Sequence, residues 1–193
     1  MRVIAGTWRG RSIEAPKGSD TRPTIDRVRE SLMSALFSQL GSFEDLRVLD
    51  AFAGSGALGI EALSRGAAYA VFCDQDVRAC NTVRANLASL GAPKESYRVL
   101  QCDVFARRPR TTHPFDLVFL DPPYAYSAES VVRLLADLDA EGSLSTDVLI
   151  PYEHAQGADL AALAATDAIA LEIVATKRYG DTCIEFLRKA STP

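Results

Sequence analysis

The segment RVLDAFAGSGALGIEALSRG, residues 47–66, decides the fold. RVLDAF has the continuous apolar character of a buried strand, and ALGIEALSRG has that of a helix. Between them lie Gly54, Gly56 and Gly59, in the GxGxxG spacing that is typical of dinucleotide-binding turns. Glycines permit a tight turn close to a ligand, and the first N–H groups of the helix are free to bind it. The segment therefore predicts a strand–turn–helix unit with a ligand at its turn.

A rhythm of strands and helices continues from this segment to the end of the chain. We expect strands at residues 47–52, 69–74, 97–103, 115–121, 147–153, 168–178 and 181–189, and helices at 57–66, 77–91, 127–142 and 160–165. Alternation of this kind predicts a mostly parallel sheet with helices on both faces. The last two strands follow each other closely enough to form an antiparallel hairpin. The predicted fold class is thus α/β and Rossmann-like, with a seven-stranded sheet and an antiparallel C-terminal strand.

The N-terminal residues precede this repeating pattern. RVIAGTWRGRSIEA, residues 2–15, predicts two short strands around a glycine-containing turn. Apolar residues at helical spacing from Thr24 to Gly41 predict a helix. We therefore expect a small hairpin extension at residues 1–23 and a main domain at residues 24–193.

Length and composition limit the class of protein. The chain has 193 residues, 48% of them hydrophobic, which is enough for one domain with a core. No apolar run reaches the roughly 18 residues of a membrane span, and the first residues lack the order of a signal peptide, so we expect a cytoplasmic protein. We also expect a monomer. The four cysteines form no CxxC pair, and His113 and His154 are expected at the surface, so no metal site is predicted.

Acidic residues end the first three predicted strands. Asp50 precedes the glycines, where it would repel a pyrophosphate but attract the ammonium and sulfonium groups of S-adenosylmethionine. Asp74 ends the second strand, where a carboxylate can accept hydrogen bonds from ribose hydroxyls. Asp103 can accept from an adenine amino group, and the N–H of Val104 can donate to the ring. The predicted S-adenosylmethionine site thus consists of Asp50, Gly54, Gly56, Asp74, Asp103 and Val104.

The fourth predicted strand ends in Asp121-Pro122-Pro123-Tyr124. Two prolines directly after a buried strand stop its hydrogen-bonded ladder and fix the backbone. The Asp121 carboxylate and the Pro122 carbonyl then become two rigid acceptors for the two N–H donors of a base amino group. They can aim its lone pair at a sulfonium methyl, while Tyr124 stacks on the base. The motif predicts methyl transfer to an exocyclic amine, with Asp121, Pro122 and Tyr124 as catalytic residues and Pro123 as a substrate contact.

Other functions remain open on these residues alone. A DNA methyltransferase acting on adenine N6 or cytosine N4 would use the same motif after base flipping, although no insertion has the size of a DNA-recognition domain. An NAD-linked oxidoreductase would use GxGxxG but would leave DPPY unexplained. A non-catalytic RNA-binding protein would leave the strand-end acids idle. Protein-glutamine methylation is related chemistry for which Asn, not Asp, is expected at position 121.

DPPY following a DxFxGxG strand resembles the amino-methyltransferases, and over nearly the whole chain the sequence resembles the bacterial 16S rRNA guanine-N2 methyltransferases. The segments that carry this similarity are RVIAGTWRGR, TRPTIDRVRESLMSAL, LDAFAGSGALGIEALSRGA and LDPPY. The resemblance implies a Rossmann-like domain with an N-terminal extension. It also implies methylation of the 2-amino group of one guanine, in 16S rRNA or the small ribosomal subunit. One departure is Asp74, where the family pattern has Glu.

Charge is unevenly distributed along the chain, whose net charge is −4. Residues 1–29 carry seven Lys/Arg against three Asp/Glu, whereas residues 111–176 carry one Arg against eleven Asp/Glu. An RNA partner would be held through local basic patches rather than through net charge. We expect phosphate contacts from Arg9, Arg11, Arg22, Arg27 and Arg29, with Arg107, Arg108 and Arg110 as a second cluster.

Overall fold

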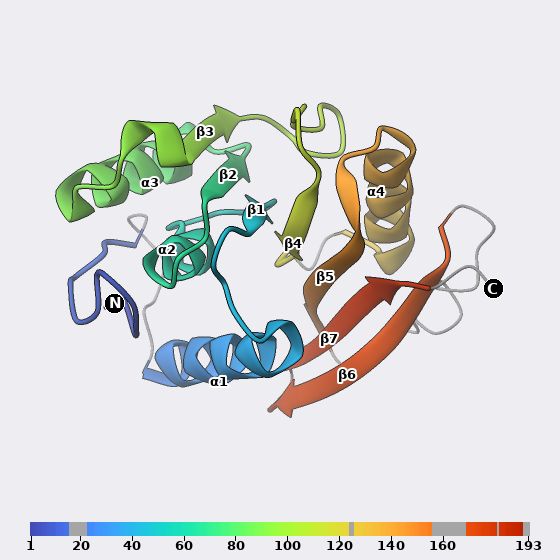
Figure 1. Ribbon diagram of the computed structural model, residues 1–193, viewed down its shortest axis with the longest axis horizontal. Coiled ribbons are helices and arrows are strands. Elements are labelled where there is room, and N and C mark those ends of the chain that lie inside the picture. The colour runs from blue at the N-terminus through green and yellow to red at the C-terminus, as the bar shows by residue number, and fades with distance from the viewer. Residues whose placement is uncertain (16–22, 124–125, 156–168, 181, 191–193) are drawn as a thin grey trace.

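One seven-stranded sheet forms the centre of the protein (Figure 1). The computed structural model describes residues 1–15, 23–123, 126–155, 169–180 and 182–190, with only the backbone for residues 23–26. The strands stand in the order β3-β2-β1-β4-β5-β7-β6. Their bounds are β1 (Arg47–Asp50), β2 (Tyr69–Asp74), β3 (Tyr97–Gln101), β4 (Phe115–Phe119), β5 (Leu144–Ala155), β6 (Leu171–Tyr179) and β7 (Thr182–Lys189).

The direction of the strands confirms the predicted topology. β3, β2, β1, β4 and β5 are parallel, and β7 runs antiparallel to both β5 and β6. The chain passes outward from β1 to β3 and then crosses to β4 on the other side of β1. The strand order therefore reverses between β1 and β4. In open α/β sheets, ligands bind at such a switch point, outside the carboxyl ends of the strands.

Helices cover both faces of the sheet. α1 (Pro23–Leu40), α2 (Ala57–Ser64) and α3 (Val77–Leu90) pack on one face, and α4 (Ala128–Ala140) packs on the other, with a short 3-10 helix η1 (Lys94–Ser96) before β3. Because side chains alternate along a strand, Val48 and Phe72 enter the first core while Leu49 and Val71 enter the second. The Asp76 carboxylate caps α3 by accepting from the N–H of Arg78 at 2.8 Å. The predicted helix at residues 160–165 lies outside the described residues.

The N-terminal segment is a turn rather than the predicted pair of strands. Its two arms meet in one isolated antiparallel bridge, between Arg2 and Ser12. The turn instead bonds to the end of α2, where the N–H of Thr7 donates to the Ser64 carbonyl at 2.7 Å. Gly6, at φ 84°, approaches so closely that a Cβ would lie 1.7 Å from that carbonyl oxygen. The two arms are also joined to each other by backbone hydrogen bonds, from Val3 to Arg11 at 2.9 Å, from Gly10 to Val3 at 2.8 Å and from Ile13 to Met1 at 3.0 Å.

The same segment contributes side chains to the core on the α1–α3 face. Val3 and Ile13 are buried, and Trp8 is 9% exposed. The N–H of Ile4 donates to the carboxylate of the buried Glu61 at 2.6 Å. The first residues of the chain are thus packed into the main fold. Within the described residues, no helix combines the length and the apolar character needed to span a membrane.

Candidate active site

A pocket of about 480 Å³ opens at the carboxyl ends of the central strands. Small-ligand sites in proteins commonly measure roughly 300–1,000 Å³. Predicted site residues on its wall are Gly54, Asp74, Asp103, Val104, Asp121, Pro122 and Pro123, joined by Ala51, Phe52, Gln75, Cys102, Tyr126 and Glu153. A second cavity of about 360 Å³ shares Phe52, Gly54, Asp121 and Glu153 with the first and extends toward α1, β6 and β7. The two cavities therefore meet at the end of β4.

The turn after β1 depends on its glycines. Gly54 at φ 53° and Gly56 at φ 79° have left-handed backbones, which cost most other residues a steric clash at Cβ. Gly59 lies so close to β2 that a Cβ would be 2.3 Å from the ring of Phe72. The tight strand-to-helix turn predicted from the sequence is confirmed.

Asp50 lies beneath this turn. Its side chain is buried, and one carboxylate oxygen accepts from the N–H of Gly59 at 3.0 Å. Burial raises the pKa of Asp50 to about 7, against the lowering effect of that hydrogen bond, and repulsion from Asp121 and Asp74 adds to the rise. Asp50 lines the second cavity. A cation bound there would stabilise its ionised form.

Asp74 joins the end of β2 to the glycine turn. Its two carboxylate oxygens accept from the N–H of Gly54 at 2.9 Å and from the N–H of Asp76 at 2.8 Å. Each oxygen has a further lone pair, and the residue lines the pocket. The carboxylate is therefore held in place with acceptor capacity left for a ligand.

The end of β3 forms the next part of the wall. Val104 is buried, while Asp103 is exposed and accepts from the N–H of Phe105 at 3.0 Å. Cys102 is only half-buried, unlike Cys73, Cys80 and Cys183, which are buried. A hydrogen bond with Cys73 lowers the pKa of the Cys102 thiol to about 7.

Asp121 stands where β4 meets β5. The N–H of Leu120 donates to the Pro151 carbonyl at 3.0 Å, and the Leu120 carbonyl accepts from the N–H of Glu153 at 2.8 Å. These bonds fix the backbone at Leu120, directly before the motif. The Asp121 side chain opens to the pocket, yet enough protein surrounds the carboxyl for desolvation to raise its pKa to about 6.

The two prolines after Asp121 differ in exposure. Pro122 is buried and Pro123 exposed, and the Pro123 carbonyl accepts from the N–H of Tyr126 at 3.0 Å. Tyr124, the predicted stacking residue, lies outside the described residues. The rings of Phe52, Phe105 and Tyr126 form an aromatic cluster beside the pocket, with the Phe105 and Tyr126 centroids 4.6 Å apart. Sequence reasoning missed both Phe52, which lies within the DxFxGxG motif but was given no role, and Tyr126, which lies two residues beyond DPPY.

Glu153 is a further acid that sequence reasoning missed. It lies near the end of β5 and lines both cavities. Burial raises the pKa of Glu153 to about 7, and repulsion from Asp121 contributes to the rise. The same rule that singled out Asp50, Asp74, Asp103 and Asp121, an acid at a strand's carboxyl end, identifies Glu153 in DVLIPYE as well.

The predicted phosphate-binding arginines fall into three groups. Arg9 and Arg27 are exposed, and Arg22 lies outside the described residues. Arg29 is 4% exposed, donates to the Arg2 carbonyl at 2.5 Å and pairs with Glu61 at 3.6 Å. The prediction that Arg29 contacts phosphates from the protein surface is therefore wrong. The Arg29 side chain is buried because the buried Glu61 carboxylate needs a counter-charge.

Arg11 is also engaged within the protein. Its guanidinium donates to the carbonyls of Ser89 and Leu90, the latter at 2.9 Å. These are the last carbonyls of α3, which have no partner within the helix. Arg11 therefore acts as a helix C-terminal cap, while its side chain remains exposed, and the predicted phosphate contact stays a prediction.

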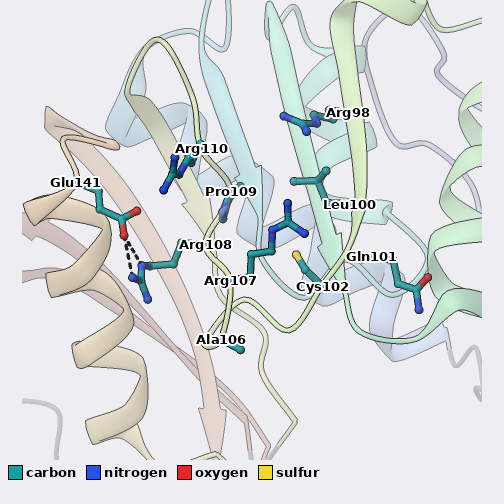
Figure 2. A pocket seen from close by; sticks show the side chains of 10 residues that line it. All are labelled: Arg98, Leu100, Gln101, Cys102, Ala106, Arg107, Arg108, Pro109, Arg110 and Glu141. Atoms are coloured by element: carbon teal, nitrogen blue, oxygen red, sulfur yellow. Dashed lines mark hydrogen bonds and ion pairs between the residues drawn. The ribbon is translucent and has the colours of Figure 1, made fainter.

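The second arginine cluster surrounds a cavity of about 470 Å³ (Figure 2). Arg98, Arg107 and Arg110 on its wall are exposed, whereas Arg108 forms ion pairs with Glu141 at 2.8 Å and Asp137 at 3.1 Å. Cys102 lines this cavity and the candidate active site alike. The basic surface thus adjoins the β3 end of the site.

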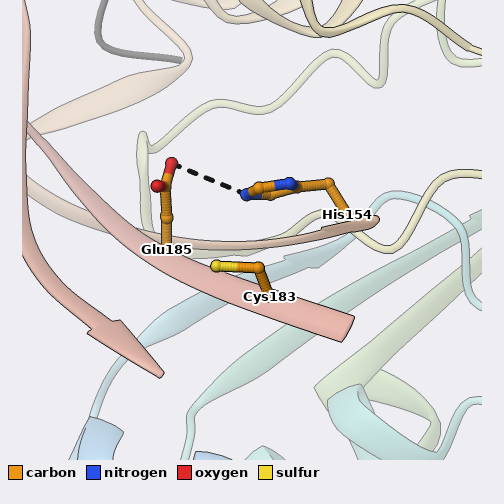
Figure 3. Close-up of side chains that lie close together, drawn as sticks. All are labelled: His154, Cys183 and Glu185. Carbon is orange, nitrogen blue, oxygen red and sulfur yellow. Dashed lines mark ion pairs between the residues drawn. The ribbon is translucent and has the colours of Figure 1, made fainter. Parts of the chain in front are cut away.

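His154 is buried, which corrects its expected surface position (Figure 3). It pairs with Cys183 in the β5–β7 register, and its Nε2 lies 3.6 Å from a carboxylate oxygen of Glu185. Ligand atoms of these three residues lie within 4.8 Å of one another. A structural zinc ion takes four protein ligands, whereas this group offers three within the described residues.

The charge of the pocket restricts the ligand it can hold. Asp74, Asp103, Asp121 and Glu153 line it, and no Lys or Arg does so in the part of the chain that the structure describes. The pyrophosphate of NAD would therefore meet four acids without a counter-charge. A ligand with a sulfonium, an ammonium, a ribose diol and an adenine matches this set of acceptors. The residues present fit S-adenosylmethionine.

Comparison with known proteins places the chain in a family. The model of the family described as Conserved hypothetical protein 95 matches residues 1–188. The Bacillus subtilis protein YlbH is 42% identical over 165 residues, which cover 83% of this chain and 85% of YlbH. Ribosomal RNA small subunit methyltransferase D of Escherichia coli is 39% identical over 154 residues, 79% of this chain and 74% of that protein.

A solved structure supports the same placement. That of the Escherichia coli protein YhhF matches with a TM-score of 0.80 at 32% identity, over 100% of this chain and 99% of YhhF. The fold is that of class I methyltransferases, as predicted. The chain therefore belongs to the Conserved hypothetical protein 95 family, together with the ribosomal RNA small subunit methyltransferase D proteins.

Proposed function

We propose that the protein transfers a methyl group from S-adenosylmethionine to the exocyclic 2-amino group of a guanine in small-subunit rRNA. The observation that carries the proposal is the acid-lined pocket at the β1–β4 switch point, which Asp121, Pro122 and Pro123 of the DPPY motif line. The relatives named as small-subunit rRNA methyltransferases support the RNA substrate.

The cofactor would lie across the carboxyl ends of β1, β2 and β3. Asp74 would accept the ribose hydroxyls, and Asp103 with the N–H of Val104 would bind the adenine. Gly54 and Gly56 leave room for the backbone to approach the cofactor. Asp50, beneath the turn, would stabilise its positively charged end.

The reaction needs a positioned amine more than a strong base. S-adenosylmethionine supplies an electrophilic methyl group attached to a sulfonium. The Asp121 carboxylate and the Pro122 carbonyl would each accept one N–H of the amino group, which directs the nitrogen lone pair toward that methyl. As the N–C bond forms and the S–C bond breaks, the amine loses a proton, which the Asp121 carboxylate can accept.

The substrate would be held by the exposed arginines near the site. Arg107 and Arg110, exposed beside the β3 end, would contact phosphates together with the exposed Arg9 and Arg27. Residues 1–23 would then serve as an extension packed on the catalytic domain, 24–193. The partner would be 16S rRNA or the small ribosomal subunit, bound by a single copy of the chain.

One experiment tests the proposal against its main alternative. Labelled S-adenosylmethionine is supplied to the protein with 30S particles, naked rRNA or DNA in parallel, and the modified nucleoside is identified by mass spectrometry. We expect N2-methylguanosine from one of the RNA samples. N6-methyladenine or N4-methylcytosine from DNA would instead establish the DNA methyltransferase, and label in none of the three would reject both.

A further inference from the structure

We propose that Glu153 reads the N1–H of the target base and thereby selects guanine. The inference rests on the proposed function, because it assigns a specificity residue to the same site. Glu153 would act beside Asp121, which accepts from the neighbouring 2-amino group. Together they would form a pair of acceptors matched to two adjacent donors on one edge of the base.

The backbone places the two carboxylates side by side. The Leu120 carbonyl accepts from the N–H of Glu153 at 2.8 Å, and Leu120 forms a parallel bridge with Tyr152. The residues that follow these two, Asp121 and Glu153, are therefore at equivalent positions on neighbouring strands. Both line the first pocket and the second cavity, at the place where the two meet. A base entering beside the methyl group would face both acids.

Electrostatics shows that this pair lacks a compensating charge in the first pocket. Repulsion from Asp121 contributes to the raised pKa of Glu153, after burial. Within the described residues, no Lys or Arg lines that pocket. Asp121 is exposed and Glu153 is half-buried, and the Arg29 side chain that lines the second cavity is paired with Glu61. A half-buried carboxylate beside a second acid is costly unless donors satisfy it. A ligand with two neighbouring N–H groups would offset that cost.

Guanine is the base that offers such donors. Its Watson–Crick edge carries N1–H next to the 2-amino group, whereas adenine N1 and cytosine N3 carry lone pairs beside their amino groups. A lone pair facing the Glu153 carboxylate would be repelled, and the carboxylate would be left without a donor. A site built to bind a donor discriminates strongly against an analogue that lacks it. Glu153 would therefore exclude adenine and cytosine, even though DPPY can accept any exocyclic amine.

The test replaces the target guanine, once mapped as above, with 2-aminopurine in reconstituted 30S particles. This base keeps the 2-amino group but has a lone pair at N1. Wild-type protein should methylate guanine at least about 100-fold faster than 2-aminopurine. Glu153→Gln should shift that ratio at least tenfold toward 2-aminopurine, because its amide can donate to N1. Glu172→Gln, an exposed glutamate on β6, is the matched control and should leave the ratio unchanged.

The outcomes separate the two proposals. If wild-type protein forms no N2-methylguanosine in any RNA, the proposed function fails. If it does, but methylates 2-aminopurine as fast as guanine, Glu153 does not read N1–H, whatever the variants do. An unchanged ratio in an active Glu153→Gln would also overturn the inference. The melting curve of Glu153→Gln shows whether this variant folds. If it does not, the inference is tested by the guanine-to-2-aminopurine rate ratios of wild type and Glu153→Asp. Because aspartate keeps the carboxylate, Glu153→Asp should retain the preference for guanine.

Discussion

The carboxylate of Asp74 accepts from the backbone N–H of Gly54 at 2.9 Å, which ties the end of β2 to the glycine turn of β1. Its other oxygen accepts from the N–H of Asp76 at 2.8 Å, at the start of α3. The residue proposed to bind the ribose thus also orders the turn beside it. Loss of its side chain would affect both parts of the cofactor site together.

Asp74→Ala should therefore weaken binding of S-adenosylmethionine about 10- to 100-fold, since hydrogen bonds to a charged group contribute roughly 1.5–3 kcal/mol. Isothermal titration calorimetry would measure this. Asp76→Ala, which removes only the cap of α3, is the control for helix stability and should leave the affinity nearly unchanged. Equal affinities of Asp74→Ala and wild type would reject the ribose assignment.

Asp121→Ala should reduce methyl transfer at least about 100- to 1,000-fold, the usual effect of removing one group that stabilises a transition state. Cofactor affinity should change little, because the residue belongs to the end of β4 and not to the ribose or adenine region. Single-turnover rates with saturating cofactor and RNA would measure the loss. Full activity of this variant would remove Asp121 from the mechanism.

The order of strands and the location of the site could be predicted because they depend on local pattern. Buried strands such as 69–74 are continuous apolar runs, and turn glycines such as Gly54 and Gly56 mark the crossings into helices. An acid at a strand's carboxyl end must lie at the same edge of a parallel sheet as its neighbours. Asp74, Asp103 and Asp121 therefore line one pocket, as expected from the sequence.

The errors concern side chains whose environment is set by distant partners. Arg29 looked like a surface cation, but the buried Glu61, 32 positions along the chain, draws it inward. His154 was expected at the surface, yet the pairing of β5 with β7 encloses it against Cys183 and Glu185. The turn of the N-terminal segment is held by α2, through the hydrogen bond from the N–H of Thr7 to the Ser64 carbonyl. None of these partners is close in sequence.

Methyl transfer should slow as the pH falls below about 7. Desolvation raises the pKa of Asp121 to about 6 and that of Glu153 to about 7, and only the ionised forms can accept the base N–H groups. The rate should fall roughly 100-fold from pH 7.5 to 5.5, because only about a quarter of Asp121 and about 3% of Glu153 are ionised at pH 5.5, and a pH–rate profile would measure it. Glu153→Gln should shift the midpoint to lower pH by removing a neighbouring negative charge.

Stability should not follow the same trend. The folded-state pKa values of Asp50, Asp121 and Glu153 lie above their ordinary values, so these groups stabilise the fold most at low pH and lose that contribution as the pH rises through about 6 to 7. As the pH falls from 7.5 to 5.5, these three groups should therefore raise the melting temperature. If the melting temperature fell together with the rate, unfolding and not protonation of Asp121 and Glu153 would explain the loss of activity.

Reversing Arg107 and Arg110 to Glu should weaken RNA binding and lower the slope of log affinity against log salt by roughly 1.5, about 0.7 or more for each lost phosphate contact. Filter binding of rRNA between 50 and 300 mM salt would measure both. Over this range the Debye length falls from about 14 Å to about 6 Å. Arg133→Glu, an exposed residue on α4 next to Glu129 and Asp137, is the net-charge control for each of the two single reversals, Arg107→Glu and Arg110→Glu. An equal effect of this control would show that Arg107 and Arg110 make no specific contact with the RNA.

Gly6→Ala should destabilise the protein far more than Gly10→Ala, although both glycines have nearly the same left-handed backbone, at φ 84° and 79°. A Cβ at Gly10 meets nothing within 4 Å, so Gly10→Ala costs only the conformational strain of about 1–2 kcal/mol. A Cβ at Gly6 would lie 1.7 Å from the Ser64 carbonyl oxygen, which is backbone and cannot turn away. The turn would have to leave α2 and expose Trp8, with a further loss of about 2 kcal/mol or more. Urea unfolding of the two variants would compare these free energies, and equal values would mean that residues 1–15 are not packed into the main fold.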